Sequence, residues 1–86
     1  MNEDLTSEQR AALKALQKLK AGYKPCAQTG GFDADDISMH CGLEANSIQL
    51  ICWDLERLGF VKEHESPAES PWLSHWILTQ EGEAAI

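Results

Sequence analysis

Apolar residues recur every three to four positions between residues 6 and 22, which predicts an amphipathic helix. Thr6 is a suitable N-cap, and Gln9 three residues later completes a capping box that satisfies two backbone amides of the first turn. Gly22 is placed to follow the last turn and to end the helix. The apolar stripe consists of Ala12, Leu13 and Leu16, continued by Leu19 or Lys20.

A second, shorter helix is predicted after a loop that contains Gly30-Gly31. Phe32 is expected in a very short extended segment, and Asp33 then caps the helix. Ile37 and Cys41 are four residues apart, so we expect both on its buried face. Gly42 is the predicted end.

The pattern of the third helix is the most regular in the chain. It begins near residues 44–46 and runs to Leu58, and Gly59 is its predicted stop. Apolar residues at spacings of three and four form its predicted core face. These residues are Ile48, Ile51, Cys52, Leu55 and Leu58.

Two strands complete the pattern. Residues 60–65 and 74–79 are predicted to be extended, and residues 66–71 form a turn-rich loop between them. Thr79 is a suitable cap for a last short helix that continues to Ile86. The predicted order is helix, helix, turn, helix, strand, wing, strand, short helix.

This order and three sequence motifs resemble the winged helix-turn-helix transcription regulators of bacteria and phages. The resemblance covers roughly residues 6–85. The motifs are Ile37-Ser38 with Cys41-Gly42-Leu43, then Leu55-Glu56-Arg57-Leu58-Gly59-Phe60-Val61, and Trp76-Ile77-Leu78-Thr79-Gln80-Glu81-Gly82.

The resemblance implies one α+β winged-helix domain over residues 1–86, of which residues 1–5 are expected to be a flexible N-terminus. It implies three helices, a two- or three-stranded antiparallel wing and a short C-terminal helix. The third helix would be the recognition helix, and the wing would span about residues 63–74. Such proteins read DNA with the outward side chains of that helix.

Composition changes this picture. The formal net charge of the 86 residues is −7, and an acidic chain is repelled by phosphate unless its cations gather on one face. No apolar run approaches the ~20 residues that span a bilayer, and the acidic N-terminus is no signal peptide, so we expect a cytoplasmic protein without membrane contact. Five of the seven basic residues lie in or just after the first helix: Arg10, Lys14, Lys18, Lys20 and Lys24.

The expected contact residues on the third helix and wing are Asn46, Ser47, Gln49, Leu50, Trp53, Arg57 and Lys62. The amide and hydroxyl side chains suit base edges, whereas the nearby Glu44 and Asp54 would repel phosphate. The wing adds His64 and His75, which are mostly neutral. We therefore predict weak DNA binding, or binding that needs a homodimer or another partner.

Leu50 and Trp53 leave an alternative open. Exposed apolar side chains on a rigid helix commonly mark protein contacts, although Trp53 is equally expected to pack over the wing or the first helix as peripheral core. A third interpretation is an acidic inhibitor that resembles nucleic acid electrostatically. Arg10, Lys14 and Lys18 recur every four residues and form either a solvated helix face or a second contact face for an acidic partner.

Other chemistry is not expected. Cys26, His40, Cys41, Cys52, His64 and His75 lack the usual zinc-binding spacing, and the odd number of cysteines argues against a disulfide framework. No nucleophile–base pair or phosphate-binding loop is evident, so we predict no catalytic residues, no metal and no cofactor. The hypotheses are a DNA-contacting regulator, a protein-interaction module and, least favoured, an enzyme.

Overall fold

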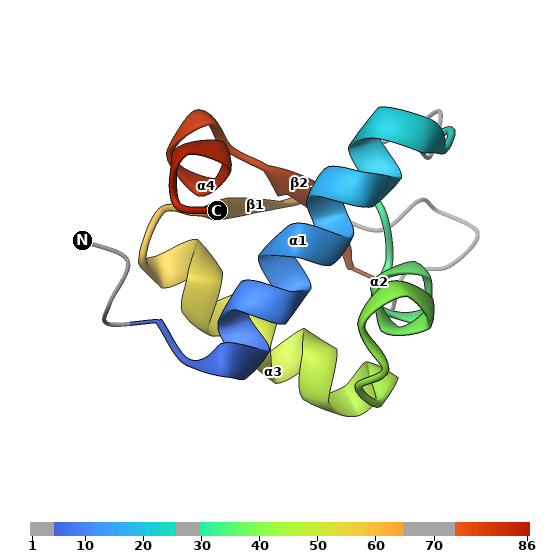
Figure 1. Cartoon of the computed structure of the whole chain (residues 1–86), viewed down its shortest axis with the longest axis horizontal. Helices are drawn as coiled ribbons and strands as arrows, with labels where there is room; N and C mark the ends of the chain where they lie inside the picture. Colours follow the sequence, from blue (N-terminus) through green and yellow to red (C-terminus); the bar gives the residue numbers. More distant parts are fainter. Residues whose placement is uncertain (1–4, 26–29, 65–73) are drawn as a thin grey trace.

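The computed structural model describes residues 5–25, 30–64 and 74–86. Its elements are α1 (Ser7–Gly22), α2 (Ala34–Cys41), α3 (Ala45–Arg57), β1 (Val61–His64), β2 (His75–Leu78) and α4 (Gln80–Ala84). In Figure 1, α1 crosses the front of the molecule, with α2 and α3 below it and the two strands and α4 above. This is the predicted α+β winged helix-turn-helix arrangement.

The predicted start of α1 is confirmed, but its predicted end is not. The Thr6 hydroxyl accepts from the Gln9 amide at 3.0 Å, and the Gln9 side chain accepts from the Thr6 amide at 2.9 Å. Gly22 belongs to the helix, and Tyr23 is the C-cap. Tyr23 has extended backbone and its amide donates to the Leu19 carbonyl, so α1 ends without a left-handed glycine.

Helices α2 and α3 begin and end close to the predicted positions. The Asp33 carboxylate caps α2 by accepting from the Asp36 amide at 2.9 Å. Gly42 ends α2 at φ 76°, and Gly59 follows α3 at φ 86°. Both angles are left-handed, which glycine adopts without the steric penalty of a Cβ atom. These two glycines set the turn between the helices and the exit from α3 into the wing.

Strand β2 is shared by two partners. It pairs antiparallel with β1 from Val61↔Leu78 to His64↔His75. Phe32, just before α2, forms a bridge with Trp76 through two backbone hydrogen bonds of 3.1 and 2.8 Å. The predicted loop at 66–71 and the side chain of Cys26 lie outside the described residues. The bridge places the start of α2 beside the wing.

The core draws on every helix and both strands. Its largest fully buried side chains are Trp76, Leu13, Leu16, Ile37, Ile48, Leu55 and Cys52. Leu5 is also buried, although it falls within the predicted flexible N-terminus; residues 1–4 lie outside the described part. Across the described ranges, no helix is both long and apolar enough to cross a bilayer.

Three residues predicted for the core are not fully buried, and one of them, Ile51, is partly buried and packs against the core from α3. Leu58 is 55% exposed, because it is the C-cap of α3 and the chain turns at Gly59 so that Phe60 packs inward instead. Cys41 is half-buried, because it is the last residue of an eight-residue helix whose buried side chain is Ile37. The errors at Leu58 and Cys41 come from extending a periodic pattern to the end of a helix.

Candidate nucleic-acid and protein interface

Four of the predicted contact residues lie in one outward stripe of α3. At about 100° per residue, Asn46, Leu50, Trp53 and Arg57 fall within a sector of about 60°, opposite the buried side of the helix. All four are exposed; Leu50 is 61% and Trp53 39% accessible. The stripe therefore combines one amide, two apolar side chains and one cation.

The remaining predicted residues flank this stripe. Ser47 and Gln49 are half-buried, one on each side of it, so only part of each polar group faces outward. Lys62 lies on β1, is exposed and pairs across the strands with Ile77. The structure thus brings the polar residues of α3 together and places Lys62 on the adjoining wing.

Trp53 leans against the base of the wing. Its indole Nε1 donates to Oε2 of Glu63 on β1 at 3.5 Å, and the Ser74 hydroxyl donates to the same oxygen. The contact agrees with packing over the wing, and the side chain is 39% exposed. Trp53 therefore packs on the wing, and its contact with a partner stays a prediction.

Sequence reasoning missed the part that Glu56 and Glu63 play. Oε2 of Glu56 on α3 accepts from the Glu63 backbone amide at 3.3 Å, and the Glu63 side chain holds Trp53 and Ser74. The carboxylates thereby fasten the wing to α3. No sequence signal marked them, because the contacts depend on how the chain leaves α3 after Gly59.

The cations expected on this face are fewer than the sequence suggested. Arg57 forms an ion pair with Asp54 one turn before it, and both side chains are exposed. His75, expected to be available on the wing, is only 7% exposed. Glu44, Asp54, Glu56 and Glu63 lie on or beside the same face. The local electrostatics therefore disfavour phosphate.

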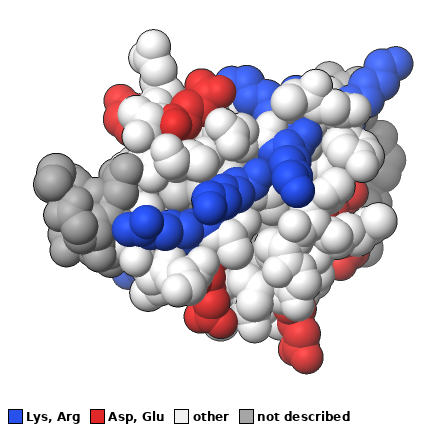
Figure 2. Space-filling model, viewed as in Figure 1, with Lys and Arg blue, Asp and Glu red and all other residues white. Residues whose placement is uncertain are grey.

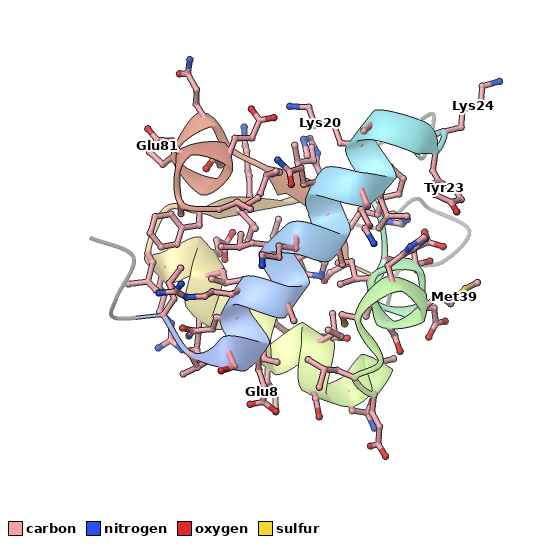
Figure 3. All side chains as sticks on the ribbon, viewed as in Figure 1. Glu8, Lys20, Tyr23, Lys24, Met39 and Glu81 are labelled. Atoms are coloured by element: carbon pink, nitrogen blue, oxygen red, sulfur yellow. The ribbon has the colours of Figure 1, made fainter. Side chains whose placement is uncertain are left out.

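The three basic residues predicted as a second contact face are exposed on α1. Arg10, Lys14 and Lys18 follow at intervals of four residues, and Figure 2 shows the resulting blue ridge running diagonally along α1. Lys20 belongs to a different side of the helix: it leans towards α4 (Figure 3) and pairs with Glu83 at 3.0 Å. The ridge faces away from the core side of α1.

Two titratable groups are shifted by their surroundings. Partial burial, followed by the charge of Asp33, raises the pKa of Asp36 above its ordinary 3.8. Burial in the core, with a smaller effect of Cys41, raises the pKa of Cys52 to about 12. Cys52 is therefore a protonated thiol at neutral pH. Within the described ranges, no three His, Cys, Asp or Glu side chains group to hold a metal ion.

Comparison with known proteins supports the fold. No protein-family model and no curated protein matches the chain. The structure is similar to the PcaV transcriptional regulator of Streptomyces coelicolor, with 28% identity over 96% of this chain and 51% of PcaV and a TM-score of 0.71. It is similar to a MarR-family transcription regulator, with 26% identity over 98% of this chain and 48% of that one and a TM-score of 0.71.

The structure of S. aureus MepR bound to DNA is also similar, with 22% identity over 95% of this chain and 59% of MepR and a TM-score of 0.68. At that identity the likeness concerns the fold alone. The chain spans about half the length of these regulators. They belong to a non-enzymatic class, in agreement with the expectation that this chain is not an enzyme. The resemblance to winged-helix transcription regulators is thus confirmed.

Proposed function

We propose that this chain is a small winged-helix regulatory protein that contacts DNA through α3 and the wing. The outward stripe of α3 carries this proposal, because it presents an exposed Asn46 and Arg57 on the side of the helix opposite its buried core face. Asn and Arg are suited to base edges and to phosphate. Ser47, Gln49 and Lys62 would add contacts at its margins.

Binding by a single copy is expected to be weak. A protein that neutralises six phosphates needs about six well-placed cations. This face supplies Lys62 and an Arg57 whose charge is shared with Asp54. We therefore propose that residues 1–86 form one winged-helix domain that acts as a homodimer, so that two faces contribute to each site. A cytoplasmic location is part of the same proposal.

Titration of duplex DNA by fluorescence anisotropy, from low to physiological salt, tests this function. Arg57→Ala should lower the affinity and reduce the salt slope by about one unit. Asn46→Ala combined with Gln49→Ala should reduce discrimination between sequences. Asp54→Asn should raise the affinity, because Arg57 then loses its competing carboxylate. Lys20→Ala, on another side of the molecule, is the matched control. Absence of binding to any duplex at low salt would refute the proposal.

Leu50 and Trp53 favour a second candidate, a protein-interaction module. Both are exposed at the centre of the stripe, where phosphate contacts would need polar groups. Leu50→Asp or Trp53→Ala should abolish capture of such a partner while circular dichroism stays unchanged. The third candidate, an acidic inhibitor that resembles nucleic acid, is favoured if the captured partner is a DNA-binding protein and duplex DNA competes with this chain for the partner's DNA-binding site.

A further inference from the structure

A groove lies beside the basic ridge, between α1 and α2. It has a volume of about 290 Å³ and is lined by Ala11, Lys14, Ala15, Lys18, His40 and Cys41. None of these lining residues is acidic, although the net charge of the chain is −7. The lining of the groove is thus positively charged, although the chain as a whole is acidic.

The two lysines of the groove are not neutralised from within the described chain. The ion pairs there are Lys20–Glu83 and Arg57–Asp54, and neither Lys14 nor Lys18 has a hydrogen bond or ion pair. They lie four residues apart, so their Cα atoms are separated by about 6 Å along the helix axis. Two unpaired ammonium groups one helical turn apart can pair with two anionic groups of a ligand that are spaced by the same distance.

The shape of the groove favours a helix as its occupant. Ala11 is small and partly exposed, so it keeps the α1 wall low and a second helix can approach closely there, whereas Ala15 is 1% exposed and belongs to the core. The opposite wall ends in His40, whose ring meets the edge of Tyr23 at a centroid distance of 4.8 Å. Tyr23 and Met39 project at this end of the molecule (Figure 3) and are exposed apolar contacts for such a helix.

A long polyanion suits the groove less well. The basic ridge is short, and red acidic side chains lie on both sides of it in Figure 2. Glu8 stands at the beginning of α1 and Glu81 on α4, as Figure 3 shows. A nucleic-acid duplex laid along the ridge would bring phosphates near these carboxylates. A short acidic segment avoids that repulsion.

We propose that this groove binds a short acidic helix of a protein partner, whose carboxylates, one turn apart, pair with Lys14 and Lys18 while its backbone lies over Ala11. The mode is helix-in-groove recognition, in which the small side chain of Ala11 allows close approach and the two cations set the orientation. It is independent of the α3 face and of DNA binding.

Two covalently constrained helical peptides, each about four turns long, provide the probes. One carries Glu at every fourth position of one face, and the other carries Gln there. Binding to the full chain is measured by fluorescence anisotropy at low salt, with amide chemical shifts locating the site. The Glu peptide should bind and shift the amides of Ala11, Ala15 and His40. Equal binding of the Gln peptide would overturn the proposal.

Variants of the chain distinguish binding in the groove from non-specific electrostatic attraction of an anionic peptide. Lys14→Gln with Lys18→Gln should weaken Glu-peptide binding about fivefold to tenfold. Lys20→Gln, on the same helix but paired with Glu83, should leave it unchanged. Ala11→Leu fills the groove without altering charge and should also weaken binding; Ala11→Met replaces it if circular dichroism changes. A full effect of the lysines with none of filling, or displacement of the peptide by duplex DNA, would refute helix docking.

Discussion

The α1–α2 side and the α3–wing side of the molecule use their charged residues differently. On the α3–wing side, Glu56 and Glu63 accept hydrogen bonds that hold the wing, and Asp54 occupies Arg57. On the α1–α2 side, Lys14 and Lys18 have no partner within the described residues. Arg57 on the α3–wing side is thus partly neutralised within the structure, whereas the α1–α2 side has cations available for another molecule.

This contrast shows that charged side chains on α3 and β1 can stabilise the fold itself, as Glu56 and Glu63 do by accepting hydrogen bonds between α3 and the wing. A carboxylate that accepts two or three hydrogen bonds cannot be replaced as freely as a solvated one. The acidity of the α3–wing side is therefore not only a matter of composition. It follows from the contacts that position the wing, and these contacts can be tested one by one.

The largest expected effect is a difference in thiol reactivity between Cys41 on the α1–α2 side and Cys52 beneath α3. With Cys26 replaced by serine, Cys41 in the groove should react with a maleimide at pH 8, whereas Cys52 should react at least about a thousandfold more slowly. Burial keeps Cys52 protonated, with its pKa raised to about 12. Mass spectrometry of peptides gives both rates. Labelling of Cys52 at a rate comparable to Cys41 would mean that the interior beneath α3 is open.

The second largest effect is expected from Gly82→Ala, which should disturb the packing of α4 against Phe60 on the α3–wing side. A Cβ atom there would lie 2.1 Å from the Phe60 carbonyl oxygen, and the backbone has to move to accommodate it. We expect a loss of about 3 kcal/mol in the free energy of unfolding, measured by chemical denaturation.

Gly22→Ala is the matched control on the α1–α2 side, since no atom lies within 4 Å of the position that its new methyl group would take. It should be neutral or stabilise the protein by up to about 1 kcal/mol. A Gly82→Ala protein as stable as the parent would show that α4 does not pack against Phe60 as described.

Glu63→Ala should remove the hydrogen bonds to Trp53 and Ser74 and destabilise the protein by about 1 to 2 kcal/mol. Glu44→Ala is its control, because Glu44 is the N-cap of α3 without a side-chain capping bond, and its loss should cost less than about 0.5 kcal/mol. Denaturant titrations compare the two. If both variants lose the same stability, the carboxylates of this side have no special structural role.

Asp36→Asn should have the smallest effect and the opposite sign. The raised pKa of Asp36 means that the folded state prefers the protonated carboxyl, so stability falls as pH rises from the ordinary value of 3.8 through the raised value. At neutral pH the variant should gain a few tenths of a kcal/mol, because Asp33 then lacks a like charge one turn away. Thermal unfolding at pH 7 and pH 3.5 should show the gain at pH 7 alone. A gain that persists at pH 3.5 would point to another cause.

Local signals in the sequence predicted the fold well. The capping box at Thr6, the cap at Asp33 and the left-handed glycines at 42 and 59 all lie where their chemistry indicated. Such features depend on neighbours a few residues away, so a sequence displays them directly. The prediction that Gly22 ends the first helix is wrong, because a tyrosine with extended backbone takes that place.

The candidate site was less predictable because its features depend on contacts between elements. The outward stripe of α3 followed from helical periodicity, but the hydrogen bonds from Glu56 and Glu63 needed the position of β1 relative to α3. The groove required Cys41 to be half-buried at the end of α2, where periodicity placed it inside the core. The hydrogen bonds of the two glutamates and the partial burial of Cys41 are set by how the elements pack together, which the local sequence pattern does not show.

The bridge between Phe32 and Trp76 has a consequence for synthesis on the ribosome. Trp76 is the largest fully buried side chain, and its backbone closes onto a residue made forty-four positions earlier. Chains emerge N-terminus first, so α1, α2 and α3 leave the ribosome before the side chain that fills the space among them. The core between α1, α2 and α3 can therefore be completed only after β2 has been translated, and a nascent chain halted before Trp76 would expose its apolar interior to chaperones.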